Sequence, residues 1–290
     1  ACSTTEEQVR EQIEILAANE VDSARWNEAV EQLVTVGRPG ARQLVALLDP
    51  AKYRGVEYRE FRDEIEHTRT GAAVVLGRIK HKAASASMDD RVAVAYRYSE
   101  RLASLRGVGE LGFTEAAVTA LETQLADVDP VIRLLAAVAL VKIGEDTARD
   151  TIVRVVVHGD DDLAELAISE LEGANYHGVP ILVALATGHE ARRERLQRAL
   201  DQVRAQLVAQ LDDDDPEVRQ ESAAALGDVD DPSVVARLLL MLEDASNLVR
   251  FNAASSLVRL GNERGTEFLF SALDNEDAVL RLNAIKSLVR

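Results

Sequence analysis

The sequence is poor in the residues that build several common classes of protein. It holds one cysteine, six prolines, 16 glycines and 4% aromatic residues in 290 positions. One cysteine permits neither an internal disulfide nor a zinc site made of several thiolates. So few glycines and prolines argue against a β-sandwich with many turns. No stretch approaches the roughly 20 apolar residues that a membrane-spanning helix requires. The core must therefore be built from small aliphatic side chains, which are abundant.

Positive charge is also scarce. The formal net charge is −17. Residues 1–110 hold 16 Lys and Arg against 18 Asp and Glu, whereas residues 111–290 hold 17 against 32. Proteins bind nucleic acid through Lys and Arg that neutralise phosphates, so this balance argues against a nucleic-acid partner. We expect instead a protein or peptide partner that is basic or neutral, and a chain that is itself monomeric.

A short pattern recurs in the C-terminal half of the chain. It runs Asp215–Arg219, Ser246–Arg250 and Asp277–Arg281, with the arginines 31 residues apart, and a further copy runs Asp129–Arg133. A small residue follows each arginine by three positions, and aliphatic residues follow it by seven and, within the chain, by ten. This spacing predicts a helix with one buried face. An Asp or Ser at the N-cap and, in two copies, a proline at the first helical position mark where each helix begins.

Weaker copies and second apolar runs complete the pattern. The weaker copies have a leucine seven residues after key positions Trp26, Arg69, Tyr98, Ala164 and Arg193. Those leucines are Leu33, Leu76, Leu105, Leu171 and Leu200. Second apolar runs lie at 44–48, 116–125, 151–157, 179–185, 203–211, 234–242 and 268–273. Short polar turns join them, so the chain is predicted to be a series of helical pairs.

The segment Asp129 to Gly144 carries Asp-Pro-x-Ile-Arg, then Ala-Ala-x-Ala-Leu and Ile-Gly. These residues resemble the short HEAT-like repeats named after the phycobilisome lyases. The resemblance is strong from Asp127 to Arg290 and degenerate before it. It implies an all-α fold, a right-handed α-solenoid (superhelix) of about nine HEAT-like helical-pair repeats. The expected divisions are a polar lead with a first helix at 1–20, degenerate repeats at 21–126 with an insertion at 50–66, and regular repeats at 127–290, the last incomplete.

Metal chemistry has few candidate ligands. The HEAT-like deoxyhypusine hydroxylases are di-iron enzymes that use several His-Glu pairs, and only His189-Glu190 matches here. The remaining histidines, which no Glu follows, are His67, His81, His158 and His177. The acidic runs at 160–162 and 212–215 suggest calcium, but neither has the glycine and final glutamate of a twelve-residue calcium loop. We interpret them as solvated turns in which one Asp caps a helix, and we expect no metal and no cofactor.

An insertion interrupts the regular spacing between key positions 26 and 69. It is rich in Tyr and Arg, the residue types that most often anchor protein interfaces. The residues predicted to bind a partner are Tyr53, Arg54, Tyr58, Arg59, Phe61 and Arg62. The alternative is that bulky residues merely pack a degenerate terminal repeat. The surface formed by the second helices of the pairs, with polar residues Arg154, Arg237, Glu243 and Glu267, is a second candidate.

The cysteine lies at position 2, in Ala1-Cys2-Ser3. A small residue before a cysteine resembles the mature end of a bacterial lipoprotein, which implies lipidation of Cys2 and a place in the bacterial cell envelope. The alternative is a chain boundary beside a cysteine, which leaves a cytoplasmic location.

No glycine-rich phosphate loop, Gly-x-Ser-x-Gly elbow or Cys-His nucleophile pair is present. The sequence therefore favours a non-catalytic scaffold or adaptor that binds another protein. The alternative is an accessory or lyase-like subunit of an enzyme complex, in which a partner performs the catalysis.

Leu140 tests the register of the repeat. Leu140→Asp is expected to lower the free energy of unfolding by more than about 4 kcal/mol, because it buries an unpaired carboxylate. Chemical denaturation measures the loss, and an unchanged midpoint would contradict the assigned register.

Overall fold

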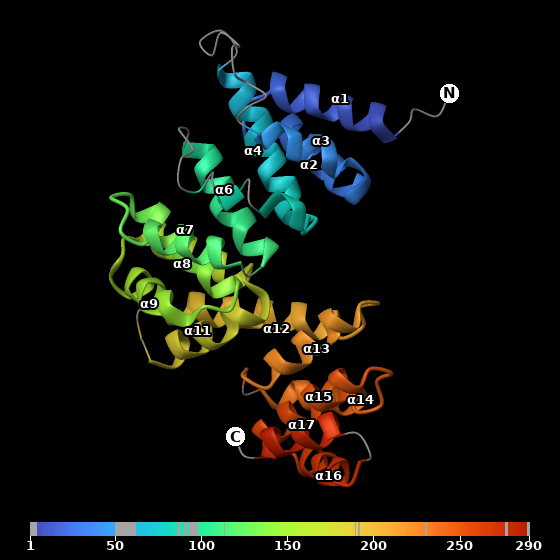
Figure 1. Ribbon diagram of the computed structural model, residues 1–290. Helices are drawn as coiled ribbons and strands as arrows, with labels where there is room; N and C mark the ends of the chain where they lie inside the picture. The colour runs from blue at the N-terminus through green and yellow to red at the C-terminus, as the bar shows by residue number, and fades with distance from the viewer. Residues whose placement is uncertain are drawn as a thin grey trace. The chain divides into compact units, whose positions relative to one another are not determined.

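The computed structural model describes residues 5–49, 62–85, 88–89, 92, 98–112, 114–188, 190, 192–229, 231–275 and 278–288. In these ranges the chain forms α-helices and short 3-10 turns and contains no strand (Figure 1). The chain divides into two compact units, Ala1–Val155 and Val156–Arg290. None of the helices in the described ranges combines the length and hydropathy needed to cross a bilayer. The all-α fold predicted from the repeat pattern is confirmed.

The N-terminal unit is a set of helices packed against one another. The helices are α1 (Thr5–Ala18), α2 (Ala24–Val36), α3 (Ala41–Leu48), α4 (Arg62–Arg78), α6 (Tyr98–Leu111), α7 (Glu115–Gln124), α8 (Pro130–Lys142) and α9 (Arg149–His158), whose last residues enter the second unit. Helix α4 lies against α6, and α6 lies against α8. A Cβ atom on Gly77 would lie 2.8 Å from the Cα atom of Gly107, so glycine permits the close approach of α4 and α6.

In the C-terminal unit, the helices of the 31-residue pattern alternate with second helices from α13 onward. The elements are α10 (Asp161–Glu172), α11 (Asn175–Gly188), α12 (Arg193–Gln210), α13 (Pro216–Leu226), α14 (Val235–Met241), α15 (Asn247–Arg259), α16 (Glu263–Ala272) and α17 (Ala278–Leu288). The three helices of the 31-residue pattern, α13, α15 and α17, pack in series, α13 against α15 and α15 against α17. Helices α14 and α16 also pack against α15, and Figure 1 shows α13 to α17 gathered in the C-terminal unit.

The buried positions are those that the spacing predicts. In each copy the leucine seven places after the key position is buried, except that Leu288 of the last helix is half-buried. These buried leucines are Leu33, Leu76, Leu105, Leu140, Leu171, Leu200, Leu226 and Leu257. The small residues at the third place of the regular copies are also buried: Ala136, Ser222, Ala253 and Ala284. Small side chains there let neighbouring helices approach while the leucines fill the shared core.

The recurring arginine has a structural role that the spacing alone does not reveal. In all four regular copies its guanidinium donates to the backbone carbonyl six residues earlier, in the turn that precedes the helix. The Nη1–O distances are 2.7 Å for Arg133, 2.7 Å for Arg219, 2.5 Å for Arg250 and 2.7 Å for Arg281. Each arginine therefore satisfies carbonyl groups that the turn would leave without a partner.

Aspartates organise the same turns from the other side. Asp129 and Asp215 are N-caps that accept hydrogen bonds from their own helices. Asp127, Asp213 and Asp244, each six residues before an arginine, accept from the backbone N–H two residues later at 2.7–2.8 Å. The predicted use of aspartates as caps is confirmed for these helices. Ser246 stands at the N-cap of α15, but its hydroxyl makes no capping bond, and Asp277 lies outside the described residues.

One predicted helical pair is wrong. The copy keyed at Arg193 and the apolar run at 203–211 were expected to form two helices, and they form the single helix α12. The intervening residues Leu200, Asp201 and Gln202 include neither glycine nor proline, so nothing in the chain ends the helix there. The run of paired helices is interrupted at this point and resumes at α13.

Asp244 also links consecutive repeats. Arg219 of α13 donates to both carboxylate oxygens of Asp244, with Nε–Oδ2 at 2.8 Å and Nη2–Oδ1 at 3.1 Å. The Arg219 hydrogen bond, aided by the N–H of Ser246, holds the pKa of Asp244 below its usual range. Asn275 occupies the equivalent place in the next repeat, six residues before Arg281.

Asp244→Asn is expected to lower the thermal unfolding midpoint by about 2–4 °C near neutral pH. Asparagine retains an oxygen for the Ser246 N–H but loses the ionic pair with Arg219. Because the pKa of Asp244 is lowered in the folded state, the wild-type advantage exists above the ordinary aspartate pKa and disappears as the pH falls through the lowered value.

Calorimetry of both proteins from pH 7 to pH 2.5 measures this difference in midpoint. Asp244→Ala is the matched control, because it removes the turn hydrogen bond as well and should destabilise the protein more. Equal midpoints at pH 7, or a difference that persists undiminished at pH 2.5, would contradict the assigned role of the pair.

Candidate binding groove

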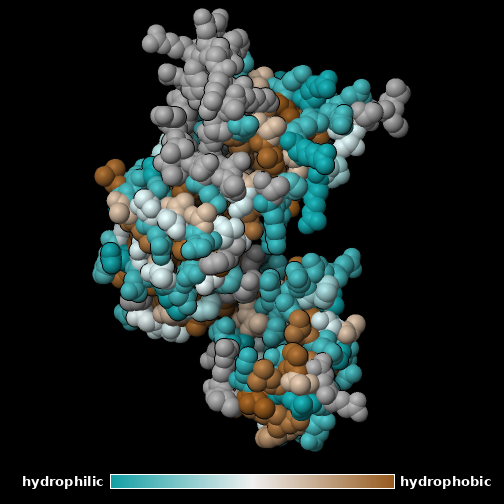
Figure 2. Space-filling model, viewed as in Figure 1, coloured by the Kyte–Doolittle hydropathy of each residue, from teal (hydrophilic) through white to brown (hydrophobic). Residues whose placement is uncertain are grey.

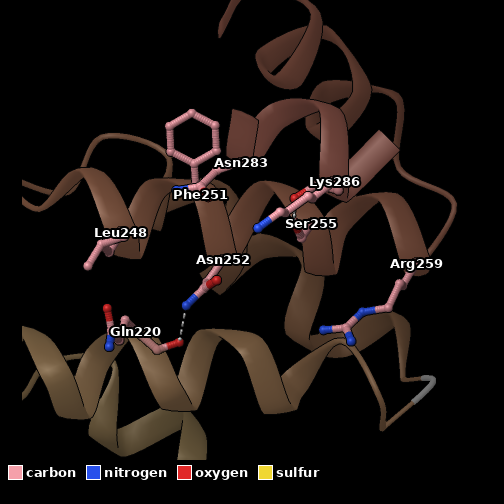
Figure 3. A pocket seen from close by; sticks show the side chains of 9 residues that line it. Gln220, Leu248, Phe251, Asn252, Ser255, Arg259, Asn283 and Lys286 are labelled. Carbon is pink, nitrogen blue, oxygen red and sulfur yellow. Dashed lines mark hydrogen bonds between the residues drawn. The ribbon is translucent and has the colours of Figure 1, made fainter. Parts of the chain in front are cut away.

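A groove of about 410 Å³ crosses the helices of the 31-residue pattern in the C-terminal unit (Figure 3). Its lining comes from one residue of α13, five of α15 and three of α17: Gln220, Leu248, Phe251, Asn252, Ser255, Arg259, Asn283, Lys286 and Ser287.

The repeat pattern places these side chains on the face opposite the core. In α15, Ala253 and Leu257 at the third and seventh places after Arg250 are buried. The other side of the helix carries Leu248, two positions before that arginine. It also carries Asn252, Ser255 and Arg259, which are two, five and nine positions after it. Asn283 and Lys286 repeat the second and fifth places in α17. The groove therefore forms where equivalent positions of the neighbouring helices α15 and α17 lie side by side.

Amides and hydroxyls form the centre of the groove. The Asn252 amide donates from Nδ2 to the carbonyl oxygen of Gln220 at 3.1 Å, which joins α15 to α13 (Figure 3). The Ser255 and Ser287 hydroxyls are 2.6 Å apart and join α15 to α17. These contacts hold the helices in register. Asn and Gln amides also keep further donor and acceptor capacity, because each carries an oxygen and two N–H groups.

The end of the groove beside the N-terminus of α15 is apolar. Leu248 is 51% exposed, whereas Phe251 is 6% exposed and packs edge-on against Phe268 with ring centroids 5.7 Å apart. Val279 of α17, at the same repeat position as Leu248, is 61% exposed. Figure 2 shows hydrophobic side chains gathered over the C-terminal helices, and exposed Leu282 and Ile285 belong to the same helix.

Charge in the groove differs from charge in the chain as a whole. The nine lining residues include two cations and no carboxylate. Arg259 donates to Asp228 at 2.8 Å, which neutralises it. Lys286 is exposed and forms no ion pair with the described residues. The groove therefore carries a local positive charge on a strongly acidic protein.

The N-terminal unit contains a buried ion pair that composition does not predict. The Nη2 atom of Arg69 lies 3.2 Å from Oε1 of Glu100, and their side chains are only 5% and 3% exposed. Burial raises the pKa of Glu100, and the charge of Arg69 opposes that rise. The pair connects α4 with α6. Because neither side chain reaches solvent, we interpret it as a structural contact and not as a site for a ligand.

The predicted partner-binding residues are not placed by the structure. Tyr53, Arg54, Tyr58, Arg59 and Phe61 lie outside the described residues, and Arg62 begins α4 with a side chain that is not described. Cys2, the predicted lipidation site, is also outside them. These predictions stay untested.

The second candidate surface, on the second helices, does not contribute to the groove. Arg237 pairs with Asp212 at 2.7 Å and Glu267 pairs with Arg264 at 3.4 Å, whereas Arg154 and Glu243 are exposed. The groove lies on the helices that carry the arginine. The sequence signal that indicates it is the polar repetition of Asn252 and Asn283 on those helices.

No group of three or more metal-binding side chains forms within the described part of the chain. The acidic runs serve the turns: Asp160 caps α10 by accepting from Leu163 N at 2.8 Å, and Asp215 caps α13. His67 lies in α4 with Nδ1 3.4 Å from the carbonyl oxygen of Ala17. His189, of the single His-Glu pair, lies outside the described residues.

Comparison with known proteins supports the repeat assignment. Residues 204–289 match the family model described as HEAT repeats. Among solved structures, Escherichia coli YibA is similar at 15% identity and a TM-score of 0.42, over 99% of this chain and 95% of that one. Human deoxyhypusine hydroxylase in complex with glycerol is similar at 17% identity and a TM-score of 0.29, over 98% and 96%. No curated protein matches the sequence. Both TM-scores are below 0.5, so the repeat assignment depends on the family model and the observed helices.

Proposed function

We propose that this chain, whose residues 204–289 are HEAT repeats, is a non-catalytic scaffold that holds a protein segment in the groove across α13, α15 and α17. The observation that carries the proposal is the repetition of Asn252 and Asn283 at one register position on neighbouring helices.

The geometry suits an extended peptide. Neighbouring packed helices lie about 8–10 Å apart, and an extended chain rises about 3.3 Å per residue, so about three peptide residues span one step. Amide side chains at the centre of the groove offer donors and acceptors to a peptide backbone, which presents both. An unstructured segment could therefore be held through its main chain, with its side chains directed to the ends of the groove.

The lining supports binding better than catalysis. It contains no histidine, cysteine or carboxylate, so it offers no side chain that titrates near neutral pH and serves as a general base. The Ser255 hydroxyl is engaged with Ser287 and not with a base. A serine nucleophile requires an adjacent base for activation.

A random dodecapeptide library displayed on phage and selected on the immobilised full chain tests the proposal. We expect enriched peptides whose affinity falls about tenfold or more in Asn252→Ala/Asn283→Ala, because each lost amide removes hydrogen bonds to the peptide.

Arg264→Ala/Glu267→Ala on α16 is the matched control, because both side chains are exposed and lie outside the groove. It should leave peptide affinity unchanged. Circular dichroism and thermal melting establish that both double variants fold. Failure to enrich any peptide, or equal affinity for wild type and the groove variant, would contradict a peptide-binding groove.

A further inference from the structure

The repeat register separates charges across the groove face. The place two residues before the arginine is Glu217 in α13, Leu248 in α15 and Val279 in α17. The place five residues after it is Ala224, Ser255 and Lys286. Exposed carboxylates thus lie on the α13 side, an apolar row lies on α15 and α17, and a lysine lies on α17.

The α13 side is strongly acidic. Glu217 is exposed, and the turn before it presents the exposed carboxylates of Asp212, Asp213 and Asp214. A carboxylate on a bound peptide is repelled from that side. It is attracted to Lys286, whose side chain lines the groove with those of Asn252 and Ser255 (Figure 3). Because Asp228 already pairs with Arg259, Lys286 is the lining cation available to a ligand.

Leu248 supplies the second anchor. It is half exposed beside buried Phe251, so an aliphatic side chain placed there would cover apolar surface that now faces water. Leu248 and Lys286 differ by seven places in the repeat register, about 10 Å along the helix axis, and by one helix spacing of about 8–10 Å. The diagonal of about 14 Å corresponds to about four residues of extended chain.

We propose that the groove selects extended peptides that carry an aliphatic residue and an acidic residue about four positions apart. The aliphatic side chain would contact Leu248, and the Asp or Glu would pair with Lys286. The inference rests on the proposed function and names the class of peptide that the groove accepts. It also refines the expectation drawn from net charge. The acidic body attracts basic partners at long range, whereas the groove itself requires a carboxylate at one place.

Sequencing of the peptides enriched on the full chain tests the inference. We expect an Asp or Glu about four positions from Leu, Ile, Val or Met. Replacing that carboxylate by Gln should weaken binding roughly three- to tenfold in fluorescence anisotropy, and added salt should shrink the difference.

Lys286→Glu should reverse the preference, so that a Lys in place of the peptide carboxylate binds better than Glu. Arg264→Glu on α16 makes the same change of net charge on an exposed residue outside the groove and should leave the preference unaltered. A double-mutant cycle between the peptide carboxylate and Lys286 then reports the direct contact.

Two failures are distinguishable. Peptides that require Asn252 and Asn283 but show no carboxylate preference, or whose preference changes equally in Lys286→Glu and Arg264→Glu, would overturn this inference and leave the proposed function standing. Absence of any groove-dependent peptide would overturn both.

Discussion

A hydrogen bond between an arginine and the turn before its own helix recurs through the regular part of this chain. Arg133, Arg219, Arg250 and Arg281 each donate to the carbonyl six residues earlier. The contact fixes how each helix leaves its turn, and the residues three and seven places later then point into the shared core. The opposite faces are left outside the core, and there equivalent positions of α15 and α17 line one groove together with Gln220 of α13.

The same turns account for part of the acidity of residues 111–290. Asp127, Asp213 and Asp244 accept backbone N–H groups within the turns, and Asp129 and Asp215 cap the helices that follow. Carboxylates are favoured at these places because the N-terminal end of a helix carries partial positive charge. The acidity of the whole surface is not shared by the groove, whose lining contains no carboxylate.

Periodicity was sufficient to predict the fold and the buried leucines, because burial acts on every repeat alike and leaves a regular record. It failed at α12, where the absence of a helix-ending residue near Asp201 matters more than the apolar pattern. The groove was missed for a different reason. Most of its lining residues are polar or charged and add nothing to a hydrophobic period, and only the structure shows that Asn252 and Asn283 face the same space. The aromatic insertion around Tyr58 lies outside the described residues and stays a prediction.

We propose that the face formed by the arginine-bearing helices of the C-terminal unit holds the partner. Side-chain amide NMR signals of deuterated protein, followed while a selected peptide is added, test it most directly. We expect the signals of Gln220, Asn252 and Asn283 to shift together and to saturate with one peptide per chain. Shifts confined to the N-terminal unit, or to the second helices α14 and α16, would contradict it.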